Sequence, residues 1–381
     1  MKICAIICEY NPFHNGHLYH IQTARALSGA DAVVCVMSGN FVQRGEAAIA
    51  EKHIRAKHAV TAGADAVIEL PVPFATANAE LFAKGAVHII SAIPNVDTLC
   101  FGAETADATQ FYKIAELCNN EPKSVSDSIK KQTQDGVSYA KARATAYLPY
   151  AQSDILSKPN NILGVEYTKA LLAARSNVQI LPILRLGGDY NDERLHPQFS
   201  SATAIRAAIK QGIETDNALP DFAKNDLTDF DNTKLETLEK YAILFKSATQ
   251  IAQVCDCTEG LENALKKAAE NNLPLVESLT SARYTSSRIR RIALQNLLNI
   301  DETLIRECLR VPLYLRVLAV KKERKDLLSV LGNSSATLLL RAHDKNVLVG
   351  AAKECFEKER FAEKVYSLLQ PKPQQEKNIF M

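Results

Sequence analysis

The stretch ICAIICEYNPFHNGHLYHIQTARAL, residues 3–27, decides the fold of the first half of the chain. It opens with a short apolar run, Ile3 to Cys8, which is typical of a strand buried on both faces. Asn11-Pro12 ends that run, because proline cannot donate a hydrogen bond to a neighbouring strand. A helical pattern begins near His17. A strand followed by a polar turn and a helix is the opening unit of an α/β protein.

The same alternation continues through the first half of the chain. Further Val- and Ile-rich runs predict strands over 32–37, 66–70, 96–101 and 179–184. Helix-period stretches separate them, over 17–27, 49–62, 78–90 and 161–174. Repeated strand–helix–strand units require right-handed crossovers and a parallel sheet. We therefore predict an α/β fold with a Rossmann-like parallel sheet, whose ligands bind beyond the carboxyl ends of the strands.

The second half of the chain has a different pattern. Amphipathic helices are predicted over 234–254, 259–270 and 286–298, and two strands over 313–320 and 337–342 around a helix over 322–331. A segment rich in Asp, Asn and Pro, 213–230, separates the halves. We expect a catalytic domain over 1–212, a mainly α-helical domain over 213–381, and a loose polar tail after residue 370.

Composition excludes several classes of protein. The chain has 381 residues, 47% hydrophobic and 23% charged, as in an ordinary globular protein. Its formal net charge of +2 means that a nucleic-acid partner requires a local basic patch. Nine cysteines without a regular framework, and no secretory signal, indicate the cytoplasm. Cys255 and Cys257 have no second pair of cysteines or histidines near them, so no metal site is predicted. No apolar run reaches the roughly 18 residues that a membrane span needs.

The turn after the first strand has the features of an anion site. It follows the carboxyl end of a strand, and the helix near His17 offers free N–H groups and a positive dipole end. Gly16 permits a close approach of a ligand to the backbone, and His14 and His17 lie three residues apart on one helical face. Two imidazoles that donate to a phosphate stabilise the charge that develops when its phosphorus is attacked. Metal ligation and plain capping are the alternatives.

A second polar stretch, SSATAIR at 200–206, suits the same ligand. Its hydroxyls at a helix start supply capping groups, and Arg206 adds a forked donor, although an ordinary capped helix would show the same residues. HNGH and SSATAIR together resemble the two signatures of the nucleotidyltransferase superfamily. That resemblance implies binding of ATP and transfer of its adenylyl group.

Five further stretches narrow the resemblance. SGNFVQRGEAAI (38–49), GADAVIELPVPFA (63–75), FGAE (101–104), PNNILGVEY (159–167) and RYTSSRIRRI (283–292) are similar to the tRNA(Met) cytidine acetate ligase family, in the same order. Two small departures, Ala47 and Gly188, remove no functional group. The resemblance implies that acetate and ATP form acetyl-AMP and that the acetyl group passes to N4 of the wobble cytidine, C34, of elongator tRNA(Met). ATP, with Mg²⁺ expected on its triphosphate, acetate and tRNA are then the partners.

The resemblance also implies the residues of the site. His14 and His17 would be catalytic, both at the α-phosphate with His17 closer, while His20 would be structural. The expected ATP contacts are Cys8, Glu9, Tyr10, Asn11, Pro12, Phe13, His14, Asn15, Gly16, His17, Gly102, Asn161, Arg185, Ser201 and Arg206. Asn161 is preferred over its neighbour Asn160, and Cys8 is expected to pack within its strand despite lying in this loop.

A basic segment in the second half is the candidate tRNA contact. Arg283, Tyr284, Arg288 and Arg291 form it, and the last two share a helical face. A second cluster, Lys321, Lys322, Arg324 and Lys325, is as well explained by a solvated surface. Lys52, Arg55 and Lys57 are expected near the active site, where they would serve phosphate, RNA or solubility.

Two other functions share parts of this pattern. An adenylyltransferase acting on a small cofactor precursor would use the same histidines but would not need the arginines of the helical half. A non-catalytic RNA-binding protein would keep the fold but would not need His14 and His17.

Overall fold

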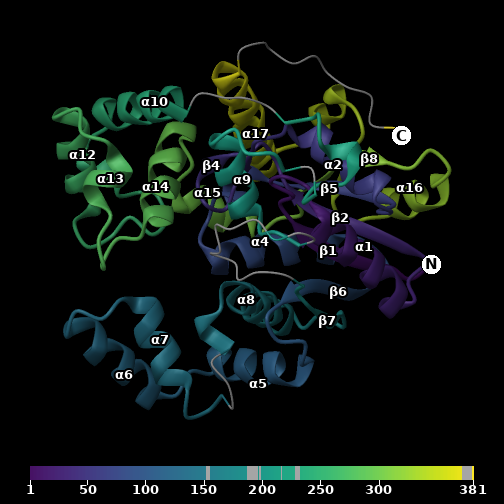
Figure 1. Ribbon diagram of the computed structural model, residues 1–381, viewed down its shortest axis with the longest axis horizontal. Helices are drawn as coiled ribbons and strands as arrows, with labels where there is room; N and C mark the ends of the chain where they lie inside the picture. Colours follow the sequence, from purple (N-terminus) through teal and green to yellow (C-terminus); the bar gives the residue numbers. More distant parts are fainter. Residues whose placement is uncertain (152–154, 187–195, 197–198, 216, 228–231, 371–379) are drawn as a thin grey trace.

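A seven-stranded sheet runs through the computed structural model, which describes residues 1–151, 155–186, 196, 199–215, 217–227, 232–370 and 380–381 (Figure 1). The strand order is β7–β6–β1–β2–β5–β8–β9. The strands are β1 (Ile3–Cys8), β2 (Ala32–Ser38), β5 (Ala66–Leu70), β6 (Val96–Ala103), β7 (Gln179–Leu184), β8 (Tyr314–Val320) and β9 (Thr337–Leu339). The first five are mutually parallel, as predicted. β8 is antiparallel to β5, which the prediction of a parallel sheet did not include.

The order of the strands places a crevice beside β1. The chain moves from β1 to β2 and β5 on one side and then crosses to β6 and β7 on the other. Connections that leave β1 and β6 in opposite directions open a crevice at the carboxyl ends of these strands. The turn after β1, with its two histidines, and Gly102 near the end of β6 both lie there.

Two helical layers cover the sheet, because successive residues of a buried strand face opposite sides. Cys4 and Ile6 pack in one cluster with residues of α1 (Asn15–Ser28) and α2 (Lys52–Thr61). Ile3 and Ala5 pack in another with residues of α3 (Val72–Ala75), α4 (Ala79–Ala92), α5 (Ala108–Asn119) and α8 (Pro159–Ala173). Strands apolar on both faces therefore form the centre of the core.

The segment between β6 and α8, for which no structure was predicted, adds further helices. These are α5, α6 (Lys123–Gln134) and α7 (Tyr139–Tyr147), followed by the 3₁₀ turn η1 (Ile155–Ser157). Two-residue strands β3 (Phe41–Val42) and β4 (Glu46–Ala47) form a hairpin between β2 and α2, also without a sequence prediction. α9 (Ala202–Lys210) and η2 (Asp221–Ala223) follow β7.

The predicted helices of the second half form a separate lobe, at the left of Figure 1. Its elements are α10 (Asn232–Phe245), α11 (Ala248–Ile251), α12 (Leu261–Glu270), α13 (Leu275–Leu279) and α14 (Ser286–Leu298). The single helix predicted over 234–254 is wrong, because Ser247 and Gln250 form a capping box that starts α11 anew. Ile289 and Ile292 of α14 face the core of the lobe, whereas Leu294 and Leu298 join the main core.

The rest of the second half returns to the sheet. After α15 (Glu302–Cys308) come β8, α16 (Lys325–Gly332), β9, η3 (Ala342–Val347) and α17 (Gly350–Leu369). The two predicted strands are thus confirmed as β8 and β9. The sheet therefore contains strands from before and from after residue 213. The division at that residue stays a prediction about folding units. The tail predicted to be loose lies mostly outside the described residues. At the end of the tail, the carbonyl of Met381 accepts a hydrogen bond from Lys322 N and its N–H donates one to Val320 O.

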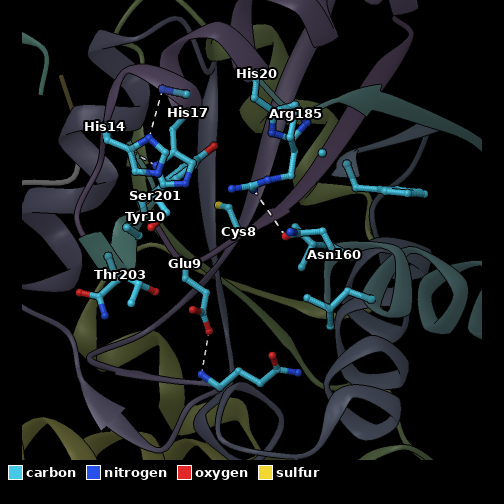
Figure 2. A pocket seen from close by; sticks show the side chains of 18 of the residues that line it. Cys8, Glu9, Tyr10, His14, His17, His20, Asn160, Arg185, Ser201 and Thr203 are labelled. Carbon is cyan, nitrogen blue, oxygen red and sulfur yellow. Dashed lines mark hydrogen bonds between the residues drawn. The ribbon is translucent and has the colours of Figure 1, made fainter. Parts of the chain in front are cut away.

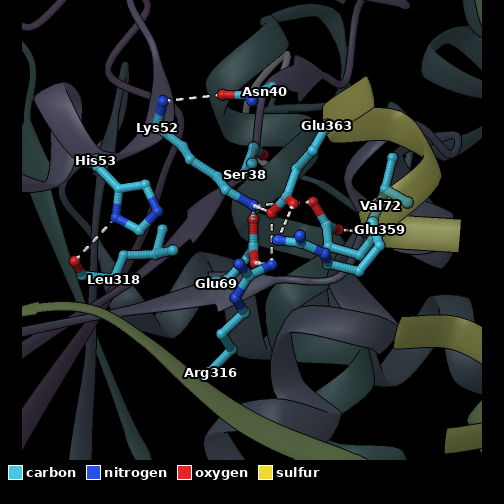
Figure 3. A network of polar contacts seen from close by, with 12 residues as sticks. Ser38, Asn40, Lys52, His53, Glu69, Val72, Arg316, Leu318, Glu359 and Glu363 are labelled. Carbon is cyan, nitrogen blue, oxygen red and sulfur yellow. Dashed lines mark hydrogen bonds and ion pairs between the residues drawn. The ribbon is translucent and has the colours of Figure 1, made fainter. Parts of the chain in front are cut away.

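A buried ionic cluster ties α17 to the sheet (Figure 3). Lys52 at the start of α2 contacts carboxylates of Glu69 on β5 and of Glu359 and Glu363 on α17. Arg316 of β8 pairs with Glu69 at 3.0 Å and with Glu363 at 2.7 Å. The three carboxylates lie close enough together to hold a metal ion, but the ammonium and guanidinium supply the positive charge there.

Burial separates the pKa values of the carboxylates in this cluster. Desolvation and the charge of Glu69 raise the pKa of Glu359 to about 8. Although burial alone would raise it, the pKa of Glu363 is held at about 2 by Lys52 and Arg316. At pH 7 the cluster therefore holds two carboxylates and one neutral acid beside Lys52 and Arg316, and Arg360, which is 36% exposed, pairs with Glu363 at 2.6 Å from the outer side. The expectation that Lys52 serves phosphate, RNA or solubility is wrong, since its side chain is 1% exposed.

Candidate active site

A pocket opens at the carboxyl ends of β1, β6 and β7 (Figure 2). The turn after β1, the β3–β4 hairpin and the starts of α1, α8 and α9 complete its wall. The lining residues are Ile7, Cys8, Glu9, Tyr10, Asn11, His14, Gly16, His17, Tyr19, His20, Val42, Gln43, Arg44, Phe82, Phe101, Gly102, Asn160, Leu163, Tyr167, Ile183, Leu184, Arg185, Leu186, Ser200, Ser201, Ala202, Thr203 and Arg206. The crevice expected from the strand order is therefore a formed pocket.

The two histidines stack on one another at the start of α1. Their ring centroids are 3.6 Å apart with planes inclined at 26°. His14 is the N-cap of α1, and its Nδ1 accepts from Gly16 N at 3.1 Å. The Nδ1 of His17 accepts in turn from His14 N at 3.3 Å. Because each Nδ1 accepts an N–H, a neutral ring carries its proton on Nε2 and is a hydrogen-bond donor there.

Burial keeps both imidazoles neutral at pH 7. Desolvation, with the charges of Arg185 and Arg206, lowers the pKa of His14 to about 3. Desolvation and the neighbouring His14 lower the pKa of His17 well below its ordinary value. Neutral donors held by backbone contacts suit a phosphate oxygen, because they need no reorganisation when charge develops on it.

Positive charge surrounds these rings. Arg44, Arg185 and Arg206 line the pocket, and Arg206 donates to Asn11 O at 2.7 Å. Ser201 caps α9 by accepting from Ala204 N at 3.0 Å, as expected from its hydroxyl. The N-termini of α1 and α9 and three guanidinium groups therefore converge on one space, which is the electrostatic requirement of a polyphosphate.

Hydrogen bonds link the motif FGAE (101–104) to the motif PNN (159–161). Oδ1 of Asn161 accepts from Glu104 N at 3.0 Å and from Thr105 N at 3.1 Å. The carboxylate of Glu104 accepts in return from Asn161 N at 2.8 Å and from the side chain of Asn160 at 2.6 Å. This exchange fixes the end of β6 to the start of α8. A Cβ on Gly102 would lie 3.3 Å from Cγ of Arg185, so glycine leaves room for the arginine.

Most of the expected ATP contacts line this pocket, but four do not. Asn161 is 1% exposed and lies behind the wall, while Asn160 lines it and accepts from Arg185 at 3.5 Å. Phe13 packs edge-on against Tyr10, and Asn15 donates to Asn217 O. Pro12 is also outside the lining set. Of the two asparagines, Asn160 lines the pocket and Asn161 does not.

The apolar side of the pocket has no signature in the sequence. Phe82, Phe101, Leu163 and Tyr167 form part of it, on α4, β6 and α8. Their helical or strand spacing is that of ordinary core residues, so no local signal distinguishes them. His20, expected to be structural, lines the pocket, with Nε2 3.3 Å from Sγ of Cys100.

Comparisons with known proteins agree with this geometry. A family model described as HIGH Nucleotidyl Transferase matches residues 1–379. The tRNA(Met) cytidine acetate ligase of Acetivibrio thermocellus is 39% identical, over 90% of this chain and 89% of that protein. The protein of the same name from Thermoanaerobacter sp. is 39% identical, over 97% of this chain and 95% of its own length. The chain belongs to the tRNA(Met) cytidine acetate ligase family.

Solved structures extend the comparison to three dimensions. Apo TmcAL of Thermotoga maritima superposes with a TM-score of 0.90 at 29% identity, covering 97% of this chain and 95% of that chain. The same protein bound with alpha-thio ATP gives a TM-score of 0.86 over the same shares. The Rossmann-like fold of a tRNA(Met) cytidine acetate ligase, predicted from the sequence, is confirmed. None of the helices in the described part of the chain combines the length and the hydropathy that a membrane span requires.

The basic segment predicted to contact tRNA lies at the start of α14 and engages acidic neighbours. Arg288 donates to Asp256 O at 3.0 Å and pairs with Glu259 at 3.0 Å. Arg291 lies 3.4 Å from the carboxylate of Asp256. Arg283 is 63% exposed, and Tyr284 donates to Glu259 O at 2.6 Å. Arg55, also expected near the active site, is fully buried and donates to backbone carbonyls of Ser38 and Ala50.

Proposed function

We propose that this protein uses ATP to ligate acetate to tRNA in the cytoplasm. In the first step acetate attacks the α-phosphorus of ATP, giving acetyl-AMP and pyrophosphate. In the second step the N4 amine of the wobble cytidine, C34, of elongator tRNA(Met) attacks the acetyl carbon, and AMP leaves. Family membership and the shape of the pocket support this assignment.

The observation that carries the first step is the stacked pair of neutral imidazoles among arginines. His14 and His17 each direct a donor from the start of α1, and Arg185 and Arg206 lie close enough to act on the pKa of His14. Donors fixed by the backbone stabilise the extra charge of a pentacoordinate phosphorus without rearranging. We assign Arg206, Ser201 and the start of α9 to the distal phosphates.

No covalent enzyme intermediate is needed in this scheme. The acetate oxygen and the cytidine amine are the nucleophiles, so the protein contributes position and charge. We propose that Mg²⁺ accompanies the triphosphate. Within the described residues the pocket wall carries a single carboxylate, which suits a Mg²⁺ held by phosphate oxygens and water rather than by a cage of acids.

We assign tRNA binding to the start of α14. Arg283 is exposed and Tyr284 is half-buried, and Arg283, Arg288 and Arg291 would exchange Asp256 and Glu259 for RNA phosphates. Arg283→Ala should weaken tRNA binding and reduce its salt dependence, without changing acetyl-AMP formation. Equal tRNA affinity at every salt concentration would remove this surface from the proposal.

The decisive experiment supplies ATP, radiolabelled acetate and total tRNA. Label in N4-acetylcytidine of elongator tRNA(Met) is the expected result. Unlabelled tRNA, together with adenylylation of a small cofactor precursor, would show an adenylyltransferase instead. His17→Ala should abolish acetate-dependent exchange of pyrophosphate into ATP, and unchanged exchange would refute the role of that imidazole.

A further inference from the structure

Glu9 is one of the expected ATP contacts, but the negative charge of its carboxylate does not suit a triphosphate. Among the described residues that line the pocket, Glu9 is the only acid. It shares the pocket with Arg44 and Arg206 and would repel a triphosphate. Its Oε1 accepts from Gln43 N at 2.7 Å, which is the only hydrogen bond of this carboxylate to the described residues. The second oxygen is therefore available to a ligand.

Glu9 lies on the side of the pocket that faces the candidate tRNA surface. In Figure 2 its carboxylate points away from the stacked imidazoles. Gln43, its partner, belongs to the loop of the β3–β4 hairpin, which packs against α14. A Cβ on Gly45 would lie only 2.5 Å from Arg291 N, and Glu46 pairs with Arg290 at 3.1 Å. A nucleotide that entered from α14 would pass this hairpin and meet Glu9.

The histidines are poor candidates for accepting a proton. Nδ1 of His14 and Nδ1 of His17 each accept a backbone N–H, so the remaining ring nitrogen carries the proton of the neutral form. Glu9, in contrast, is held by a backbone donor and has a free oxygen. Burial raises the pKa of this carboxyl group, while Arg206, Arg44 and Arg55 oppose that rise.

We propose that Glu9 binds the exocyclic amine of the target cytidine and accepts its proton. A carboxylate is the side chain that accepts a hydrogen bond from N4 of cytosine, whereas uracil would present a carbonyl oxygen to it. Glu9 thus contributes both to the choice of base and to the transfer step. This inference rests on the proposed function.

The step balances without another reactant. N4 of the cytidine forms a bond to the acetyl carbon, and the bond from that carbon to the AMP oxygen breaks with its electron pair going to AMP. The proton released by N4 passes to the free oxygen of Glu9 and then to water. The carboxylate is regenerated for the next turnover.

The test separates the two half-reactions in the full-length protein. Acetate-dependent exchange of radiolabelled pyrophosphate into ATP reports acetyl-AMP formation. Single-turnover transfer from preformed acetyl-AMP to tRNA(Met) reports the second step. Glu9→Gln keeps the shape of the side chain but lowers its basicity, and Glu9→Asp keeps a carboxylate. Glu80→Gln makes the same chemical change on α4, in an exposed pair with Lys84, and is the matched control.

We expect Glu9→Gln to slow transfer by about 100-fold or more while exchange changes by less than about threefold. The transfer rate of the wild type should rise with pH as Glu9 ionises, and the rate of Glu9→Gln should not show this rise. Glu9→Asp should recover part of the wild-type transfer rate. Transfer at the wild-type rate would overturn the inference. So would an equal loss in both steps, which would place Glu9 at ATP or its Mg²⁺. Wild-type protein that forms no acetylcytidine would instead overturn the proposed function, and this inference with it.

Discussion

Replacing Lys52 by methionine tests the ionic cluster that joins α17 to the sheet. The substitution keeps most of the length of the side chain and removes only the ammonium. Lys52 is 1% exposed and Glu69 is fully buried, so water does not replace the lost charge. With Glu359 neutral at pH 7, two ionised carboxylates would keep only Arg316 and, on the outer side of Glu363, Arg360, which is 36% exposed and therefore screened by water.

The expected loss follows from that imbalance. Removing one partner of a buried ion pair costs about 3–5 kcal/mol, because the other charge remains buried and uncompensated. We therefore expect Lys52→Met to lower the free energy of unfolding by about 3–5 kcal/mol at pH 7. Glu69→Gln on the same background removes the fully buried carboxylate that has lost its ammonium, while Arg316 keeps its pair with Glu363. The double variant should recover more than about 1 kcal/mol.

Urea unfolding followed by circular dichroism measures both quantities, provided that the transitions are two-state. Unfolding of wild type, the two single variants and the double variant gives the coupling energy directly. A loss below about 1 kcal/mol for Lys52→Met would refute the reasoning. Strict additivity of the two substitutions would refute it as well, because the charges would then not interact.

Three more predictions concern the same structure. Gly45→Ala should weaken ATP binding in calorimetry, because the added Cβ forces the β3–β4 hairpin away from α14. Gly29→Ala is the control, since Gly29 also has a positive φ but lies in open space; it should cost about 1–2 kcal/mol of stability and leave ATP binding unchanged. Equal ATP affinities of the two variants would contradict this prediction. The pKa of Glu359, about 8 in the folded state and 4.5 ordinarily, means that its protonation stabilises the fold at low pH and that this stabilisation is lost as pH rises to 8. Stability of the wild type relative to Glu359→Gln should therefore fall by up to about 1.4 kcal/mol per pH unit in urea unfolding between pH 5 and 8, and parallel curves would exclude it. Asn161→Ala should lower the free energy of unfolding by about 1–3 kcal/mol, because the N–H groups of Glu104 and Thr105 lose their acceptor. Asn160→Ala should mainly raise the KM for ATP. The reverse pattern would restore Asn161 as the ligand contact.

The sheet and the histidine turn could be predicted because their signals are local. Each of the five parallel strands is a short apolar run between turn residues, and buried parallel strands have no other pattern. His14 and His17 follow the first of them directly, so the strand order alone places them at the crevice.

The features that escaped prediction depend on partners distant in sequence. Lys52 and Arg55 are charged residues on a helix, and nothing near them shows that both are buried. The sequence predicts tRNA contacts for Arg288 and Arg291 but does not show their ion pairs, because Asp256 and Glu259 lie 29 to 35 positions away. The two-residue strands of the β3–β4 hairpin are too short to produce a period-2 pattern.

The ionic cluster also has to form late in synthesis, because its members lie far apart along the chain. Lys52 and its partner Glu363 are 311 positions apart. At about 5–20 residues per second, roughly 15 to 60 seconds separate their emergence from the ribosome. Throughout that interval Lys52 and Glu69 lack the partners that α17 supplies, so the complete set of ion pairs forms only after the α17 segment has left the ribosome. The ion pairs that fix α17 to the sheet are therefore among the last contacts that the chain can make.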